Sequence, residues 1–292
     1  MAILVTGATG HIGSRVAEIL AERGAPLQRL ARDPAKAPKL EEASIVRGDY
    51  ADPVSLVAAM DGIDTVFLVS AAGPPLERAR LHGNVIDAAV AARVRRLVYL
   101  SFQSASATSP FPYSAAHLLT EAHLKQSGLA FTNLRDSFYL DLLPEITEEN
   151  GDICGPAGSG KAAWVAREDV AQVAAAVLTE DRHQGQTYDV TGSEAFGLGE
   201  AATRLSALTG RQVRYKEETQ EAARRRLIAT GVSDCEIDAS IGTYLAIASG
   251  ELSQTSDTVE RLTGRRPLTL EAYFNAFPER LGALASPRST RA

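Results

Sequence analysis

Three glycines at a fixed spacing near the start of the chain constrain its fold more than any other feature. They lie in the run Thr6-Gly7-Ala8-Thr9-Gly10-His11-Ile12-Gly13, between the short apolar segment 3–5 and a helical pattern that extends to about Glu22. In this spacing the first glycine allows a tight turn, the second lets a phosphate approach the backbone, and the third lets the helix pack on the strand. The free N–H groups at the helix start would face the phosphates. The strand-to-helix context favours a dinucleotide site over a purely structural turn.

The alternation of strand and helix patterns continues through the first half of the chain. Short apolar, largely β-branched runs occur at 27–31, 44–46, 65–69, 96–100 and 130–132, with helical patterns at 76–92 and 114–126. Asp52-Pro53 has the residue types of a helix N-cap followed by proline at the first helical position. This regularity predicts right-handed crossovers and an α/β fold of the Rossmann type, a doubly wound parallel sheet with helices on both faces.

The second half of the chain is less regular. Glycines crowd 151–160, and the pattern predicts strands at 162–165, 187–190 and 212–215, a helix at 168–178, and mostly helices from 198 onward. We therefore divide the chain into a dinucleotide-binding domain at 1–134, a smaller and mostly helical substrate-side region at 135–285, and a frayed tail at 286–292. Within the second region, 168–191 is expected to return to the core of the first.

Composition excludes several classes of protein. The chain has 292 residues, of which 45% are apolar and 23% are charged, so it should fold into one large or two intimate domains. Its net charge of −6 gives no general attraction for nucleic acid or anionic membranes, and the basic run 224–226 fits a solvated helix face. Two cysteines without metal-ligand spacing exclude a disulfide framework and favour a reducing compartment. With neither a signal peptide nor an apolar run of membrane-span length, we expect a cytoplasmic protein without a metal site.

The residue at the end of the second strand indicates which dinucleotide binds. NAD sites place an acidic residue about 20 positions beyond the glycines, on the ribose 2′-hydroxyl. This chain has Arg32 there, and a guanidinium forks onto a 2′-phosphate, which predicts NADP(H). The alternative is that Arg32 is a solvated loop charge paired with Asp33.

Two further stretches are expected to line the cofactor. Asp49, after the third strand, could accept a hydrogen bond from the adenine amino group, although Gly48-Asp49 could equally be a plain turn. Ser70, Ala71 and Ala72 end the fourth strand and are small, as a backbone that passes beside a ribose requires.

Several of these stretches together resemble a known family. They are Thr-Gly-Ala-Thr-Gly-x-x-Gly at 6–13, Leu-Ala-Arg-Asp-Pro-Ala-Lys at 30–36, Gly-Asp-Tyr at 48–50, and the segments 127–135, 255–258 and 262–265. Over about residues 1–280 the chain resembles the NmrA-like branch of atypical short-chain dehydrogenases, nearest in pattern to NAD(P)H:quinone reductases and triphenylmethane reductases. The resemblance implies an NADP-binding Rossmann domain, a small C-terminal domain and a substrate cleft between them. It also implies cofactor contacts at residues 7–12, Arg32 and 70–72, and at Asp136, Ser137, Phe138 and Tyr139.

The chain departs from the family at the residues of proton transfer. Short-chain dehydrogenases usually carry a Tyr-x-x-x-Lys pair after the fifth strand, whereas this chain has Tyr113 and His117. The lysine that often follows Thr-Glu is Ala122 here, and Asp136 replaces an asparagine. Four residues apart on a helix, Tyr113 and His117 share one face, and the fifth strand carries Ser101 toward the same crevice. We expect His117 to orient substrate or ribose and Tyr113 to be an auxiliary donor; the alternative is an exposed Tyr113 and a structural His117.

The leading prediction is an NADPH-dependent reductase of a planar conjugated acceptor, such as a quinone or a cationic dye. Hydride transfer to such an acceptor needs positioning more than acid catalysis, which suits a site without the lysine. Phe102, Phe138 and Trp164 could form apolar walls for the substrate, or they could be plain core. The alternatives are an NADP-binding redox sensor without turnover and a ketoreductase-like enzyme with Tyr113 as acid. An open nicotinamide pocket would favour the enzyme. We expect a small aromatic or quinone-like substrate, no nucleic-acid or membrane partner, and a monomer or homodimer.

Overall fold

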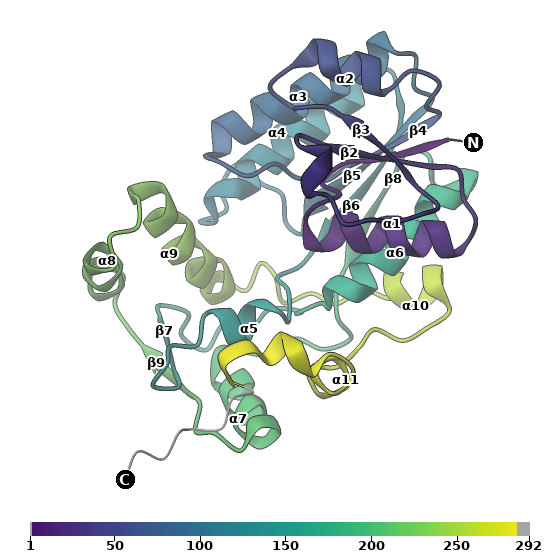
Figure 1. The fold of residues 1–292 in the computed structure, drawn as a ribbon. Helices are drawn as coiled ribbons and strands as arrows, with labels where there is room; N and C mark the ends of the chain where they lie inside the picture. The colour runs from purple at the N-terminus through teal and green to yellow at the C-terminus, as the bar shows by residue number, and fades with distance from the viewer. Residues whose placement is uncertain (1, 285–292) are drawn as a thin grey trace.

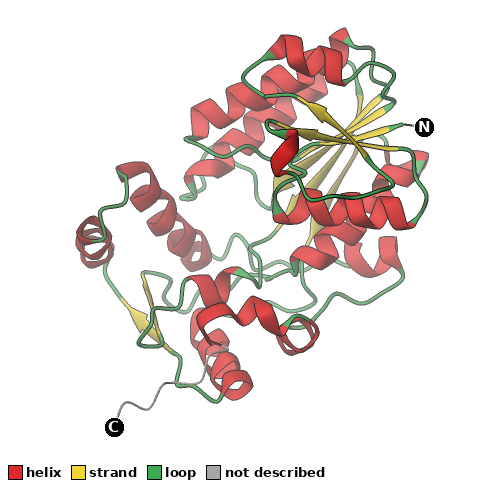
Figure 2. Ribbon diagram, viewed as in Figure 1, coloured by secondary structure: helices red, strands yellow, loops and turns green. Residues whose placement is uncertain are grey.

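The computed structural model describes residues 2–284, and a seven-stranded parallel sheet organises them (Figures 1 and 2). The strand order is β3-β2-β1-β4-β5-β6-β8. These strands are β1 (Ile3–Val5), β2 (Leu27–Ala31), β3 (Ser44–Arg47), β4 (Thr65–Leu68), β5 (Arg96–Phe102), β6 (Ala130–Asp136) and β8 (Gln186–Val190). The order reverses between β1 and β4, and ligands of such sheets bind in the crevice at the carboxyl ends of the strands at this point.

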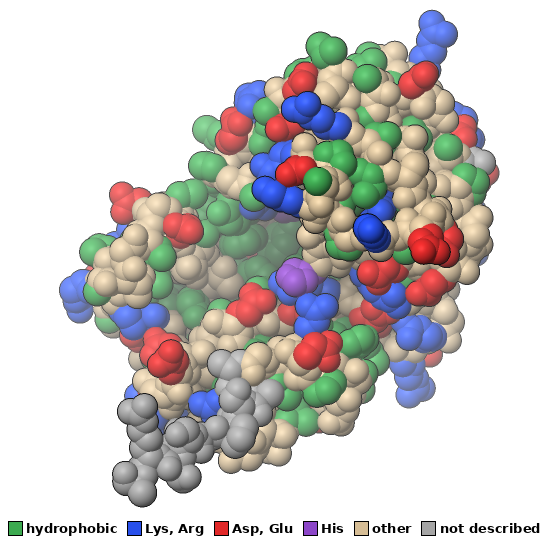
Figure 3. Space-filling model, in the orientation of Figure 1, with side chains coloured by type: hydrophobic (Ala, Val, Ile, Leu, Met, Phe, Trp, Pro, Cys, Tyr) green, Lys and Arg blue, Asp and Glu red, His purple; other side chains and the backbone are tan. Residues whose placement is uncertain are grey.

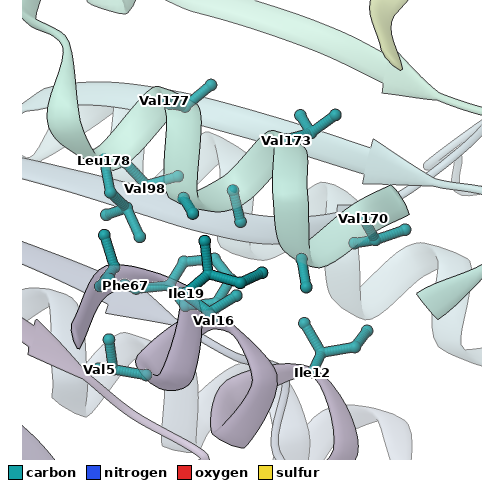
Figure 4. Packing of buried hydrophobic residues seen from close by; sticks show 14 of the residues in the cluster. Val5, Ile12, Val16, Ile19, Phe67, Val98, Val170, Val173, Val177 and Leu178 are labelled. Carbon is teal, nitrogen blue, oxygen red and sulfur yellow. The ribbon is translucent and has the colours of Figure 1, made fainter. Parts of the chain in front are cut away.

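Helices cover both faces of the sheet (Figure 1). On one face lie α1 (His11–Glu22) and α6 (Arg167–Thr179), and on the other lie α2 (Pro53–Ala59), α3 (Pro75–Ala91) and α4 (Pro112–Gln126). Val16 and Ile19 of α1 lie beside the sheet residue Phe67, and Leu178 of α6 points toward the same cluster (Figure 4). Since both faces are covered, the central strands β1, β4 and β5 are buried along their whole length, whereas the edge strands β3 and β8 keep exposed positions.

A second unit with its own core lies beside the carboxyl edge of the sheet (Figure 1). It contains α5 (Leu142–Glu145), the parallel pair β7 (Asp152–Gly155) and β9 (Arg214–Glu217), α7 (Leu198–Thr209), α8 (Gln220–Ala229), α9 (Asp234–Ser249), α11 (Leu270–Ala276) and the 3₁₀ segment η3 (Pro278–Leu284). The remaining elements lie with the sheet: α10 (Thr258–Thr263) packs against α6, and two 3₁₀ turns are η1 (Pro34–Lys36) and η2 (Asp181–His183). Among residues 2–284, no helix is long and apolar enough to cross a bilayer.

The observed elements confirm the predicted parallel α/β fold and correct the second half in detail. Asp52 caps α2 as predicted, accepting from the N–H groups of Val54 and Ser55. Segment 162–165 is not a strand: it makes only isolated bridges, Ala162 to Phe196 and Val165 to Tyr139. The strand β7 was not predicted, because glycines crowd that stretch, and β9 begins two residues later than the strand predicted at 212–215. The strand β8 joins the sheet, and α6 packs against one face of it. The predicted frayed tail 286–292 lies outside the described residues.

We expect Gly13→Ala to destabilise the fold, because helix and turn touch backbone to backbone there. A Cβ at position 13 would lie 2.3 Å from the carbonyl oxygen of Gly7, so the turn would have to open. Such overpacking typically costs about 1–3 kcal/mol. The matched control is Gly199→Ala in α7, where a Cβ meets no atom within 4 Å and should be neutral or slightly stabilising. Thermal unfolding of both variants tests this, and an unchanged Tm for Gly13→Ala would contradict the close packing.

Candidate functional site

Two adjoining cavities lie along the carboxyl edge of the sheet. The first has a volume of about 340 Å³ and is lined by Gly7, Thr9, Gly10, Leu30, Ala31, Arg32, Gly48, Asp49, Tyr50, Val69, Ser70, Ala71, Ala72 and Leu81. The second, of about 350 Å³, is lined by Ser70, Arg78, Leu100, Phe102, Phe111, Tyr113, His117, Asp136, Ser137, Phe138, Tyr139, Leu142, Arg167, Ala239, Ser240 and Thr243. Ser70 lines both cavities, so they meet at the end of β4. Figure 3 shows a hollow between the sheet and the C-terminal unit, with hydrophobic side chains inside and basic ones on the rim.

The glycine turn fits a pyrophosphate at the mouth of the first cavity. Gly7 has a φ of +62°, and a Cβ there would lie 2.9 Å from Val69 Cβ, so only glycine suits this position. At Gly10 a Cβ would meet only the Gly7 oxygen, at 3.4 Å, which leaves the outer side of the turn open. No side chain caps the first turn of α1 within the described residues. The N–H groups at the start of this helix therefore remain available to an anion.

Tyr50 supplies a contact that the sequence analysis did not anticipate. Its hydroxyl lies 2.5 Å from Thr6 Oγ1 and donates to the carbonyl oxygen of Val69 at 2.9 Å. The N–H of Val69 in turn donates to Thr6 Oγ1. This network joins the glycine turn to the end of β4. Asp49 lines the same cavity and also stabilises its own turn, since its Oδ1 accepts from the Ala51 N–H.

Arg32 is exposed at the end of β2 and lines the first cavity. Its neighbour Asp33 accepts from the N–H of Ala35 and pairs with Lys36, 3.6 Å away. In the described part of the chain the alternative pairing of Arg32 with Asp33 is thus not formed. Arg32 therefore borders the first cavity at the end of β2.

Aromatic side chains form the apolar walls of the second cavity. Phe102, Phe111 and Phe138 pack as a triangle of rings. The centroid of Phe102 lies 4.8 Å from that of Phe111 and 5.3 Å from that of Phe138, and the latter two are 5.3 Å apart. The prediction that Trp164 also lines the substrate pocket is wrong. Trp164 is buried in the core of the C-terminal unit, where its Nε1 donates to the carbonyl oxygen of Phe196 at 3.0 Å.

Ser101 does not reach either cavity, contrary to the prediction. Successive side chains of a strand point to opposite faces, and on β5 it is Leu100 and Phe102 that line the second cavity. Ser101 therefore points toward α4, where it donates to Glu121 Oε1 at 2.6 Å. Arg135 holds the same carboxylate in a two-point contact, so Ser101 belongs to a buried structural cluster.

Tyr113 and His117 both line the second cavity, one turn apart on α4. The Tyr113 ring lies under the Arg78 guanidinium, 4.0 Å from ring centroid to Cζ, and burial raises the pKa of its hydroxyl. His117 is 6% exposed, and its Nδ1 is 2.8 Å from the Tyr99 hydroxyl. Burial, aided by His82 and Arg78, holds the pKa of His117 well below its usual value. His117 is therefore neutral at physiological pH.

Three more residues of the cavity carry charge or a buried polar atom. Arg78 of α3 donates to Ser70 Oγ at 3.2 Å, while its buried Nε has no partner among the described residues. Arg167 of α6 lies 3.4 Å from Asp141. The buried Ser137 Oγ also lacks a described partner. No motif singles out Arg78 in the sequence; its only signal is a basic residue in the first turns of the helix after β4.

The chain matches a family model described as NAD(P)H-binding over residues 7–181. It is 33% identical over 286 residues to the NAD(P)H azoreductase of Xenophilus azovorans, covering 96% of this chain and 99% of the relative. It is also 33% identical over 275 residues to quinone oxidoreductase 2 of Escherichia coli strain K12, covering 92% and 96%. The crystal structure of the NADPH-dependent quinone oxidoreductase from Escherichia coli complexed with NADPH matches with a TM-score of 0.87 and 32% identity, over 94% of this chain and 99% of that one.

A further solved structure is that of the Citrobacter sp. triphenylmethane reductase complexed with NADP(H). It matches with a TM-score of 0.85 and 29% identity, over 94% of this chain and 100% of that one. The predicted NADP cofactor is confirmed by these cofactor-bound relatives together with the family match. The chain belongs to the NAD(P)H-binding, NmrA-like family of atypical short-chain dehydrogenases and is an NAD(P)H-dependent oxidoreductase.

Proposed function

We propose that this protein reduces planar quinone-like acceptors with NADPH, and that the second cavity holds the acceptor. The observation that carries the proposal is the junction at Ser70, where an aromatic-walled cavity with a neutral histidine opens beside the cofactor cavity. Bound NADPH supplies a hydride ion. The relatives that reduce quinones and azo compounds by name cover nearly the whole chain, which supports the same reaction class here.

The residues of the first cavity would hold the cofactor. The glycine turn and the start of α1 receive the pyrophosphate, and Arg32 receives the 2′-phosphate. Ser70 to Ala72, in the wall of the first cavity, and the segment 136–139, in the wall of the second, would also hold the cofactor.

The charge of the second cavity favours neutral or anionic acceptors. Hydride transfer to a quinone puts negative charge on a carbonyl oxygen, and a positive group nearby stabilises that charge. Arg78 is such a group, and burial strengthens its electrostatic effect. A cationic dye, by contrast, would be repelled by Arg78.

Asp136 is placed to supply the proton that completes the reduction. It is buried at the end of β6, lines the second cavity and accepts a hydrogen bond from the Tyr139 hydroxyl. Burial raises the pKa of Asp136 to about 8, so the carboxyl group is protonated at neutral pH. The acceptor takes a hydride and this proton, and Asp136 regains its proton from solvent.

The two other functions considered from the sequence have less support. A redox sensor does not need an open cavity beside the cofactor, and this protein has one of about 350 Å³. A ketoreductase would need an acidified tyrosine, whereas burial raises the pKa of Tyr113 and no lysine lies one turn away at position 117.

Replacing Arg32 with alanine should abolish the preference for NADPH. Losing a charge-assisted contact costs about 1.5–3 kcal/mol, or roughly ten- to hundredfold in NADPH affinity. NADH binding should hardly change, because NADH lacks the 2′-phosphate. Calorimetric titration with NADPH and NADH measures both affinities. Arg266→Ala is the matched control, because it removes an exposed positive charge outside the cofactor cavity. Equal affinities of the wild-type protein for the two cofactors would contradict the assignment.

Replacing Arg78 with methionine should change which quinones are reduced. Hydrogen bonds to charged groups contribute about 1.5–3 kcal/mol, so kcat/KM for a sulfonated naphthoquinone should fall roughly tenfold or more relative to its neutral parent. NADPH absorbance, followed with neutral, sulfonated and cationic acceptors, gives the ratio. Arg80→Met is the matched control, because Arg80 lies on the same helix but is exposed and paired with Glu77. If Arg78→Met leaves the ratio of kcat/KM for the sulfonated and neutral quinones unchanged, Arg78 does not select acceptors by charge. If the wild-type protein turns over no quinone, the proposed function is refuted.

Asp136 should make the protein less stable as pH rises. Its native pKa of about 8 exceeds the ordinary value near 4, so the native state retains a proton that the unfolded chain releases. The free energy of unfolding should therefore fall between about pH 5 and pH 8, by up to about 1.4 kcal/mol per pH unit from this group. Asp136→Asn keeps the shape and removes that slope, whereas the exposed Asp61→Asn should not. Urea unfolding of the cofactor-free protein at several pH values measures it; identical slopes in wild type and Asp136→Asn would rule out the raised pKa.

A further inference from the structure

A chain of buried hydrogen bonds connects the two cavities through the interior of the protein. It starts at the backbone N–H of Ala71, in the wall of the first cavity, which donates to His82 Nε2 at 2.8 Å. It ends at His117 in the wall of the second cavity, whose Nδ1 lies 2.8 Å from the Tyr99 hydroxyl. His82 and Tyr99 are fully buried, so their polar atoms must satisfy one another.

The first link determines where His82 carries its proton. A backbone N–H only donates, so His82 Nε2 accepts and holds no proton. Burial, with Arg78 nearby, lowers the pKa of His82 to about 3, so the ring is neutral and its proton lies on Nδ1. That nitrogen is 2.9 Å from Thr120 Oγ1 and 3.3 Å from the Tyr99 hydroxyl. Thr120 Oγ1 accepts the hydrogen bond from His82 Nδ1–H, because the hydroxyl proton of Thr120 is itself donated to the carbonyl oxygen of Ala116 at 2.8 Å.

The direction of the next link follows from the first. Since His82 Nδ1 carries a proton, the Tyr99 hydroxyl cannot donate to it. Two acceptors remain near this hydroxyl, Thr120 Oγ1 and His117 Nδ1. Thr120 Oγ1 already accepts from His82, so we assign the Tyr99 proton to His117 Nδ1, 2.8 Å away. A phenol O–H is more acidic than a neutral imidazole N–H and is therefore the better donor of the pair. Burial raises the pKa of Tyr99, so the hydroxyl keeps the proton that it donates.

We infer that this relay holds His117 in the tautomer with its proton on Nε2, and that this N–H is the donor offered to a carbonyl oxygen of the acceptor. A neutral imidazole that accepts at Nδ1 has only Nε2 left to carry a proton. His82 and Tyr99 are thus positioning residues, which decide the donor nitrogen of His117 without contacting the substrate. The identity of the acceptor rests on the proposed function, whereas the tautomer is a property of the protein alone.

The relay also determines which acceptors the cavity recognises. A quinone oxygen has lone pairs and no proton, so it pairs with an N–H and is repelled by a bare ring nitrogen. The hydrogen bond strengthens as negative charge develops on that oxygen during hydride transfer. With the opposite tautomer, the cavity would favour substrates that present an O–H or N–H group.

Nitrogen NMR of the free protein tests the tautomer directly. The chain has five histidines, so ¹⁵N-histidine labelling gives few signals, and the His117→Ala variant assigns those of His117. We expect a protonated, pyrrole-type Nε2 and an unprotonated, pyridine-type Nδ1. A proton on Nδ1 of His117, with Tyr99 turned to donate to Thr120, would overturn the inference.

The Tyr99→Phe variant tests whether Tyr99 acts through His117. Without the hydroxyl, His117 should populate both tautomers, and kcat for a quinone should fall about three- to tenfold, as for one lost hydrogen bond. The Kd for NADPH should stay the same. Tyr188→Phe is the matched control, because it removes an equivalent Tyr–His contact, 2.9 Å to His183 Nδ1, outside both cavities. It should leave the His117 signals and kcat unchanged.

A double-mutant cycle separates positioning from packing. In a His117→Ala background, Tyr99→Phe should lower kcat no further if Tyr99 acts through His117. If the two variants instead lower kcat by independent factors that multiply in the double variant, Tyr99 does not act through His117 and the positioning role is overturned. Failure of the proposed function is distinguishable: a wild-type protein that reduces no quinone but shows the Nε2–H tautomer refutes the donor role and leaves the tautomer standing. Quinone turnover with the Nδ1–H tautomer refutes the relay alone.

Discussion

The close packing of α1 against the glycine turn is the constraint on which both cavities depend. At Gly13 the helix and the turn approach so closely that a single methyl group would overlap the carbonyl oxygen of Gly7. This contact places the uncapped first turn of α1 at the carboxyl edge of the sheet. The hydroxyl of Tyr50 joins the same turn to Val69, at the end of β4. The anion site and the segment at Ser70 therefore share one rigid support, and the second cavity begins where this support ends.

The second cavity gathers side chains from segments far apart in the chain. Arg78 comes from α3, His117 from α4, Asp136 from the end of β6 and Thr243 from α9. Parallel strands with right-handed crossovers bring their carboxyl ends, and the helix starts that follow, to one edge of the sheet. The C-terminal unit then closes this edge from the other side (Figure 3). Enclosure removes water, which neutralises His117 and Asp136 and leaves the positive charge of Arg78 beside them.

The family's usual proton-transfer residues are replaced here by groups whose behaviour depends on burial. The histidine at position 117 is not a cation that could acidify Tyr113, because desolvation keeps it neutral. In the inferred relay, His82 and Tyr99 fix the tautomer of this histidine. Asp136 becomes a neutral acid at neutral pH through the same desolvation. In the proposed function, the apolar surroundings of these two groups take the part for which short-chain dehydrogenases usually carry a lysine.

The sheet, the glycine turn and the NADP(H) cofactor could be predicted from the sequence, since these depend on local spacing. The glycine positions, the Asp52 cap and Arg32 act within a few residues of their own backbone. Which side chains line the second cavity, and which form the relay behind it, depends on tertiary contacts. Ser101 and Phe102 are adjacent, yet strand alternation turns one to Glu121 and the other to the cavity. Trp164 looked like a substrate wall but is core, and the His82–Tyr99–His117 relay has no motif, because its hydrogen bonds form between separate elements only when α3, β5 and α4 pack together.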